Sequence, residues 1–290
     1  MRTRNIVSAI AAAAVAFSAV SFSAFAEDQP EGYIYFMADK TTIGQGFTVT
    51  PRKVAFYEGE TGLDVVKRAA DVLTEDSGYG AYITAFADED LETEIPDEIK
   101  AVVPEMTGRN TEGYLSAMDY TAESGWSYFV NDEYAQVGIG DYIPADGDVV
   151  CFSFTVYGYG ADLGIDNSSW GGAAALVPGV KKAELIKLCA EADGTDVDEN
   201  IFTWGMETLA EYGVTQEEID NAVNGLSGAM ESTAESVSTA DTAEAPAEDT
   251  ADAAVDETEK GSPSTGVEGA AVAFAVVLLA GAGVALSKKK

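Results

Sequence analysis

The aromatic side chains of the segment GWSYFVNDEYAQV (residues 125–137) are the ones in this chain best suited to bind a ligand. Trp126, Tyr128 and Tyr134 offer large rings that supply contact area at low conformational cost. We therefore predict that they form a binding face for a flat or cyclic ligand or for sugar rings. A competing interpretation assigns about half of the aromatic rings to the core, because strand alternation sends Trp126 and Tyr128 to one face and Phe129 to the other.

The residue types that most enzymes need are missing or lack a pattern. The chain contains no histidine, which removes the commonest general base and the commonest metal ligand. No phosphate-binding loop or dinucleotide fingerprint is present. Asp193, Asp196 and Asp198 suggest calcium, but Gly194 comes too early for an EF-hand, which favours a capped acidic turn. We predict no enzymatic activity, no catalytic residue, no metal and no resident cofactor.

The charge balance limits the partners of the chain. Among 290 residues there are 16 basic and 50 acidic side chains, a net charge of −34. Binding to nucleic acid requires clustered Lys and Arg, so nucleic acid is not an expected partner. Two cysteines, Cys151 and Cys189, could form one disulfide bond, and two buried thiols fit the sequence equally well.

The N-terminus has the features of a signal peptide. Two arginines precede an apolar run over residues 6–20, and Ala24 and Ala26 form a small-x-small cleavage pattern. We predict a signal peptide over residues 1–26, removed by signal peptidase after Ala26. A retained N-terminal membrane helix is the alternative.

The C-terminus predicts an anchor. Residues 270–286 carry no charge and are followed by three lysines, which favours a transmembrane segment with its lysines in the cytoplasm. Just before this run, Pro263, Thr265 and Gly266 match the cell-wall sorting signal of Gram-positive bacteria, which residues 262–290 therefore resemble. A serine stands where that signal usually has leucine, which leaves the class of sortase open. An ordinary membrane anchor is the alternative.

These two ends predict export and attachment at the cell surface. The expected processing partners are signal peptidase and a sortase, and the expected attachment is to peptidoglycan or to the membrane. We expect the surface domain to bind an unknown small molecule or a surface polymer.

The residues after the signal peptide divide by composition and periodicity. Residues 27–165 predict strands with one amphipathic helix over residues 61–73, which Thr61 and Asp64 begin as a capping box. Two strands, one helix and then a run of strands predict an α+β fold of the ubiquitin-like β-grasp type, a mixed sheet around one helix. The segment 125–137 predicts a hairpin about an Asn131-Asp132 turn.

The C-terminal part of the chain predicts helices and then a stalk. Residues 166–226 read as a small helical packet, in which Thr215 caps the last helix and Gly225 ends it. Residues 227–261 are rich in Ala, Thr, Ser and acidic side chains and contain no aromatic residue, which predicts a disordered acidic stalk.

Several short motifs in order resemble the transcobalamin-like C-terminal domain family, whose bacterial members are similar to the C-terminal domain of animal cobalamin carriers. They are Gly44-x-Gly46, Glu58-Gly59, Gly125-Trp126, Val130-Asn131 and Asp146-Gly147-Asp148. The resemblance covers residues 33–165 and implies a β-grasp fold and a binding role. It also implies a cobalamin-type ligand, a corrinoid. The alternative function is an adhesin that binds a glycan or a protein polymer.

Overall fold

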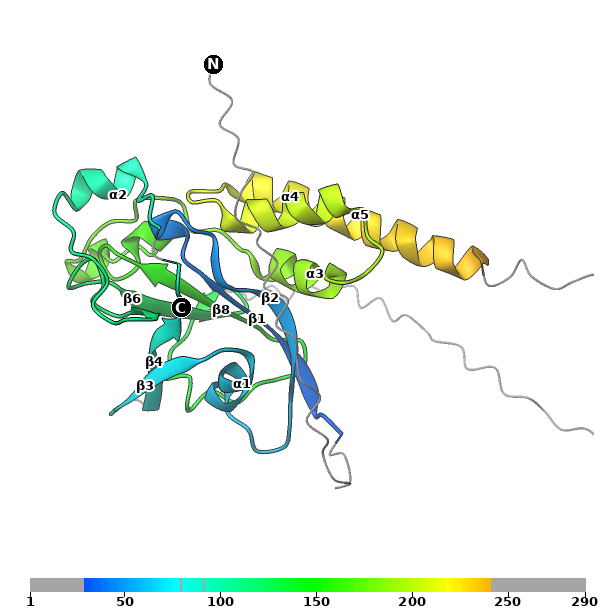
Figure 1. The fold of residues 1–290 in the computed structure, drawn as a ribbon, viewed down its shortest axis with the longest axis horizontal. Helices are drawn as coiled ribbons and strands as arrows, with labels where there is room; N and C mark the ends of the chain where they lie inside the picture. The colour runs from blue at the N-terminus through cyan, green and yellow to red at the C-terminus, as the bar shows by residue number, and fades with distance from the viewer. Residues whose placement is uncertain (1–28, 79, 91, 241–290) are drawn as a thin grey trace, which may run out of the picture. The chain divides into compact units, whose positions relative to one another are not determined.

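The main element of the fold is a mixed sheet of five strands in the order β2-β1-β8-β6-β7. Figure 1 labels β1, β2, β6 and β8 of this sheet. The computed structural model describes residues 29–240 except residues 79 and 91. Strands β1 and β8 pair in parallel, and the other neighbours pair antiparallel. This arrangement confirms the predicted α+β class. The strands are β1 (Gly32–Asp39), β2 (Phe47–Phe56), β6 (Gly125–Val130), β7 (Glu133–Tyr134) and β8 (Val149–Thr155).

One face of this sheet packs against a helix and a smaller antiparallel sheet, in the order β3-β4-β5. Alternation along β1 and β8 directs Phe36 and Phe152 to this face, where their rings meet the ring of Phe86 from β4. These rings lie in the largest apolar core of the β-grasp part. The elements are α1 (Gly62–Ala69), β3 (Val72–Ser77), β4 (Gly80–Ala87), α2 (Asp97–Val102) and β5 (Tyr114–Ser116).

Helix α1 begins as predicted and ends early. The side chain of Thr61 accepts from the backbone of Asp64, and Asp64 accepts from the backbone of Thr61, which completes the capping box. The predicted extension to residue 73 is wrong, because Ala70 is extended and Val72, in β3, pairs with Phe86 of β4. Leu73, expected on the buried helix face, is 40% exposed. Strand pairing has overridden the helical period here.

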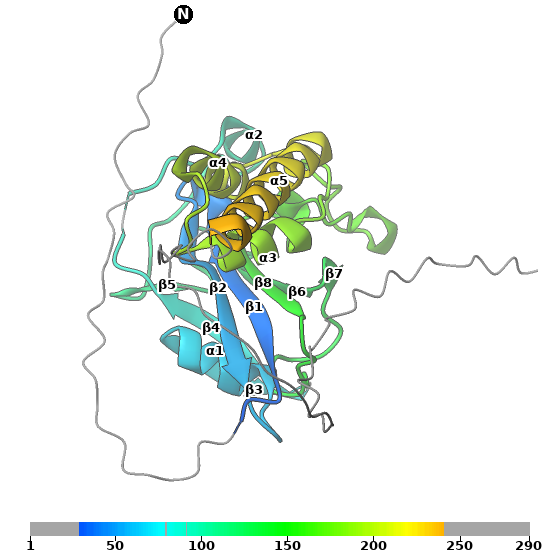
Figure 2. The ribbon, with the colours of Figure 1, turned by 90° about the vertical axis from the view of Figure 1, so that its right-hand side faces the viewer.

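The opposite face of the sheet is covered by three helices, α3 (Ala183–Ala192), α4 (Glu199–Ala210) and α5 (Gln216–Ala240), as Figure 2 shows. Met37 and Cys151 of the sheet share one core with Leu185 and Cys189 of α3. The predicted helical packet therefore completes the core of the β-grasp sheet. Both cysteines are buried free thiols.

Helix α5 is longer than the sequence predicts. Thr215 and Glu218 form the predicted capping box. Gly225 does not end the helix, which continues to Ala240, so residues 227–240 of the expected stalk are helical. A β-carbon on Gly225 would lie 2.6 Å from the ring of Trp204, so this glycine permits close packing of α4 on α5.

The predicted terminal segments lie outside the described residues. Residues 1–26, the stalk beyond Ala240 and the sorting signal over 262–290 all belong to this part. Within residues 29–240, no helix combines the length and the apolar character needed to cross a membrane.

Candidate ligand-binding site

A cavity of about 330 Å³ lies on the helix-covered face of the sheet, beyond the reach of α3. Its floor is formed by Cys151 and Ser153 of β8, and one wall by Phe129 and Tyr134 of the β6–β7 hairpin. The other walls come from residues 162–165, 177–182 and 211–214. Drug-sized ligands occupy pockets of about 300–1,000 Å³, so a small molecule would fit here.

The cavity lies at the end of this sheet face that α3 does not reach. Tyr35 and Met37 of β1 pack under α3, but the next side chain on that face of the strand is Asp39. On β8, Cys151 joins the apolar core and Ser153 lies beyond it. The sheet face therefore changes from apolar to polar along its length. Its polar end is covered by residues outside α3, α4 and α5, among them residues 177–182 and 211–214.

A buried ion pair lies next to the floor of the cavity, beneath Ser153. The Asp39 carboxylate is fully buried and accepts from the Ser153 hydroxyl at 2.7 Å. The Lys182 ammonium lies 3.1 Å from the same carboxylate. Burial alone would lower the pKa of Lys182, but the charge and hydrogen bond of Asp39 act together with Cys151 and Asp132 and raise this pKa overall, so the ammonium keeps its charge. Burial also raises the pKa of the Cys151 thiol to about 12, which keeps it neutral.

The hairpin turn fixes the wall that carries Tyr134. Asn131 and Asp132 have φ values of 52° and 67°, the left-handed pair that a two-residue hairpin turn requires, which confirms the predicted turn. The Asp132 carboxylate accepts from the backbone N–H groups of Lys182 at 2.7 Å and Ala183 at 2.9 Å. This side chain therefore joins the hairpin to the start of α3, where unpaired N–H groups need partners.

Two further polar groups lie in the cavity wall. Asp162, in the short helix η2 (Ala161–Leu163), accepts from the backbone N–H groups of Val156 at 2.7 Å and Tyr157 at 3.1 Å. Burial raises the pKa of Asp162 to about 6. The Tyr212 hydroxyl is buried and has no hydrogen-bond partner within the described part of the chain. Because Tyr212 lines the cavity, this hydroxyl is a donor without a partner in the cavity wall.

The structure separates the three predicted binding residues. Trp126 donates from Nε1 to the Leu115 carbonyl at 2.9 Å and packs edge-on to Phe86, with ring centroids 4.6 Å apart. Tyr128 stacks on Phe152 and donates its hydroxyl to a backbone carbonyl. Both rings lie on the α1 side of the sheet, as the core interpretation expects.

Tyr134 is 50% exposed and lies across the sheet from the other two residues, in the cavity wall. Its ring meets Phe129 edge-on at 5.6 Å. No single face joins the three predicted residues, and their role in binding stays a prediction.

Sequence reasoning missed Asp39, Lys182 and Tyr212. Asp39 follows the apolar run YIYFMA and is 143 residues from its partner Lys182. An acidic residue at the end of a buried strand was the available signal, but the ion pair could not be found without the fold.

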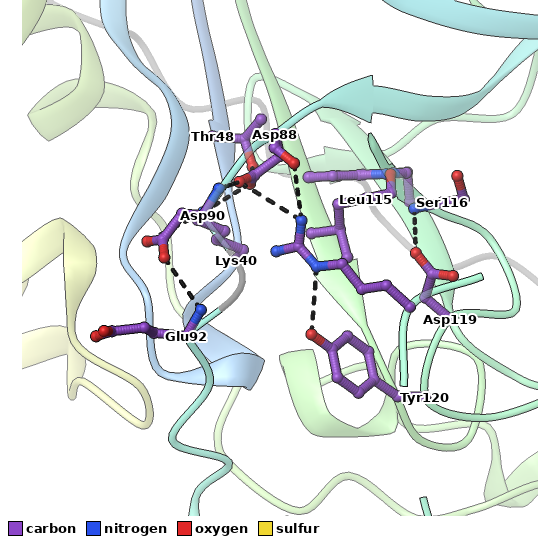
Figure 3. A network of polar contacts seen from close by, with 11 residues as sticks. Lys40, Thr48, Asp88, Asp90, Glu92, Leu115, Ser116, Asp119 and Tyr120 are labelled. Carbon is purple, nitrogen blue, oxygen red and sulfur yellow. Dashed lines mark hydrogen bonds and ion pairs between the residues drawn. The ribbon is translucent and has the colours of Figure 1, made fainter. Parts of the chain in front are cut away.

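A second buried polar cluster lies just beyond the end of β1, around Lys40 and Asp88 (Figure 3). The Lys40 ammonium lies 2.6 Å from the Asp88 carboxylate, and both side chains are almost fully buried. Arg109 is 3.6 Å from the same carboxylate, and Thr48 donates to it at 2.9 Å. Asp88 therefore joins β2, the end of β4 and the loop that precedes β5, and its role is structural.

The comparisons with known proteins are limited in extent. Residues 109–156 match the model of a family described as a domain of unknown function, DUF4430. This segment contains three of the motifs that carry the transcobalamin-like resemblance. No curated protein matches the chain.

Two solved structures are similar to part of it. Haptocorrin in complex with Cbi has 16% identity and a TM-score of 0.30, covering 46% of this chain and 27% of haptocorrin. A protein from Ruminococcus gnavus ATCC 29149, named as a candidate metal-binding protein, has 15% identity and a TM-score of 0.23, covering 43% of this chain and 97% of that protein. The chain thus spans about a quarter of the length of haptocorrin. Within residues 29–240, no group of three or more Asp, Glu or Cys side chains is placed to hold a metal ion.

Proposed function

We propose that this protein is a non-enzymatic binding module that holds a small molecule in the cavity beside Tyr134. The observation that carries the proposal is the cavity itself, which has aromatic and aliphatic walls and whose lining residue Lys182 is paired with the buried Asp39 carboxylate. Small-molecule sites have this character, a mostly apolar hollow with few polar groups. The lack of histidine supports a role without catalysis.

The chemistry of the walls favours a neutral or cationic ligand that contains a ring. The chain carries a net charge of −34, which disfavours anions. Phe129 and Tyr134 offer ring surfaces, and the Tyr212 hydroxyl offers a hydrogen bond to an acceptor. The transcobalamin-like resemblance makes a corrinoid the first ligand to test. A corrinoid is larger than the cavity, so one edge or one amide arm would enter and the rest would lie outside.

We infer from the two ends of the sequence that the module is displayed at the cell surface. N-terminal sequencing of the mature protein should start at Glu27, after cleavage behind Ala26. Thr265→Ala should move the protein from the wall fraction to the membrane or the medium. Unchanged fractionation would favour an ordinary membrane anchor.

The binding proposal is tested on the purified full chain. Cyanocobalamin, cobinamide and a panel of neutral and cationic ring compounds are screened by thermal shift, and hits are measured by calorimetry. Tyr134→Ala should weaken binding at least about tenfold, since aromatic contacts dominate many binding sites. Tyr82→Ala is the matched control, because Tyr82 is 40% exposed on β4, outside the cavity lining. Equal binding by both variants would contradict the proposed site.

Tyr212→Phe tests the hydrogen-bond donor. Removing a buried hydroxyl that has no partner should leave the melting temperature unchanged or higher. Binding of a ligand with a carbonyl or ether acceptor should weaken, and binding of a ligand without one should not.

A further inference from the structure

The most exposed aromatic residue of the described chain lies outside the cavity, on the loop between β8 and α3. Trp170 is 91% exposed, at the end of the short helix η3 (Ser168–Trp170). Tyr159, on the same loop, is 68% exposed. We call residues 157–176 the Trp170 loop. Burial of a large aromatic ring is strongly favourable, so a tryptophan left almost entirely in water needs an explanation.

Internal hydrogen bonds hold the Trp170 loop in a defined shape. Asn167 donates from its backbone to the Ala173 carbonyl at 3.0 Å and accepts from the Trp170 backbone at 3.1 Å. The Asn167 side chain donates to the Gly158 carbonyl at 2.9 Å. This one residue therefore connects the part that carries Trp170 to the part that carries Tyr159.

The backbone at Tyr159 is unusual for its residue type. Tyr159 has a φ of 53°, and the glycines on both sides of it are left-handed as well. A non-glycine residue rarely adopts this conformation, and such outliers concentrate at functional sites. The turn directs a tyrosine into solvent where an asparagine or a glycine would be less strained.

The surroundings of the two rings fit a sugar better than a protein partner. Within the Trp170 loop, only Tyr159 and Trp170 are exposed large hydrophobic residues, and Asp166, Ser168 and Ser169, which precede Trp170 in the sequence, are exposed polar residues. A protein-binding surface has a contiguous apolar centre, which this loop lacks. A pyranose ring has apolar C–H faces and hydroxyl edges, so it can stack on an aromatic ring and bond to neighbouring polar groups.

We propose that the Trp170 loop is a binding site for a neutral oligosaccharide, with Trp170 and Tyr159 stacking on sugar rings. The ligand is neutral because the exposed Asp166 lies on the same loop and the whole chain is strongly acidic. The loop is ordered before binding, so little conformational entropy is lost when a sugar docks. This site is separate from the cavity lined by Tyr134. The oligosaccharide proposal therefore does not depend on whether that cavity binds a ligand.

The test uses the purified full chain on an array of neutral and anionic oligosaccharides, followed by titration with cellotetraose, maltotetraose and chitotetraose. At least one neutral oligosaccharide should bind, and tetragalacturonate should not. Trp170→Ala should weaken binding at least about tenfold and Tyr159→Ala severalfold. Trp204→Phe is the matched control, since Trp204 is the other exposed tryptophan, at 42%, and lies on α4.

A second measurement does not depend on replacing Trp170. In the Trp204→Phe protein, the exposed tryptophan that remains is Trp170, so the bound sugar should protect the fluorescence from acrylamide quenching. The proposal is overturned if no neutral oligosaccharide binds. It is also overturned if Trp170→Ala binds as the parent does, or if a bound sugar leaves quenching unchanged. Tyr134→Ala should not alter sugar binding, which separates this result from the test of the cavity.

Discussion

Replacing Asp88 by Asn should be the most damaging single change in the polar cluster of Figure 3. Asp88 is the anion that two buried cations share, Lys40 at 2.6 Å and Arg109 at 3.6 Å. The side chains of Lys40 and Arg109 are only 3% and 7% exposed. An uncharged residue at position 88 therefore leaves Lys40 with the more distant Asp90 carboxylate, at 3.8 Å, and leaves Arg109 with the uncharged Asp88 carbonyl and Tyr120 hydroxyl.

The size of the effect follows from the geometry. Breaking a buried ion pair by removing one partner costs about 3–5 kcal/mol, so we expect Asp88→Asn to lower the free energy of unfolding by about 4 kcal/mol. Lys40→Met should cost roughly half as much, because Asp88 keeps Arg109 and the Thr48 hydroxyl as partners. Which of the two variants loses more unfolding free energy is therefore as informative as the size of either loss.

The assay is urea unfolding of the full chain followed by tryptophan fluorescence. A slope of about 2–3 kcal/mol per molar urea converts the expected loss at position 88 into a midpoint lower by about 1.3–2 M. Asp97→Asn is the control, since its partner Lys100 and its own carboxylate are exposed, and its midpoint should not change. An Asp88→Asn midpoint within about 0.3 M of the parent would refute the reasoning, as would a larger loss in Lys40→Met.

Four further predictions follow from the same structure. Cys151 and Cys189 are buried with pKa values raised to about 12, so neither should react with a thiol reagent at pH 8 until urea unfolds the protein. Asp162 binds its proton more tightly in the folded state, with a pKa of about 6, than in the unfolded state, so its contribution to stability falls as pH rises from about 4 to 6. Asp162→Asn should reduce that slope by at most about 1.4 kcal/mol per pH unit in urea titrations. Asp64→Ala removes the α1 capping box and should cost about 1 kcal/mol by the same method. Trp126→Ala should cost about 3 kcal/mol and lower the melting temperature sharply, and a small change would mean that the ring is not core.

Features set by neighbouring residues could be predicted from the sequence. The capping boxes at Thr61 and Thr215 and the turn at Asn131-Asp132 each depend on groups within a few residues. Helix ends were harder to predict, because a glycine such as Gly225 can either end a helix or allow another helix to pack closely against it. Only the contact with Trp204 of α4 distinguishes the two.

The candidate site was largely beyond prediction. The hairpin and its Asn131-Asp132 turn were predicted correctly, and Tyr134 lies exposed on β7 after that turn. The strand period that sends Trp126 and Tyr128 to one face gives no information on which face is core. The Asp39–Lys182 pair and the Tyr212 hydroxyl come from distant parts of the chain. The Trp170 loop had no signal, since a tryptophan in a loop is as often a core anchor as an exposed ring.

The parallel pairing of β1 with β8 has a consequence for how the protein folds. Strand β1 ends at Asp39 and its partner begins at Val149, so the centre of the sheet closes only after a long loop has been ordered. Until then, the β1–β2 pair presents an open edge rich in residues such as Ile34 and Phe36, which are fully buried in the native state. Such an edge is a template for pairing with other chains. During synthesis the nascent chain is therefore most prone to aggregation after β2 has been made and before β8 is available, and substitutions that slow the docking of β8 lengthen that interval.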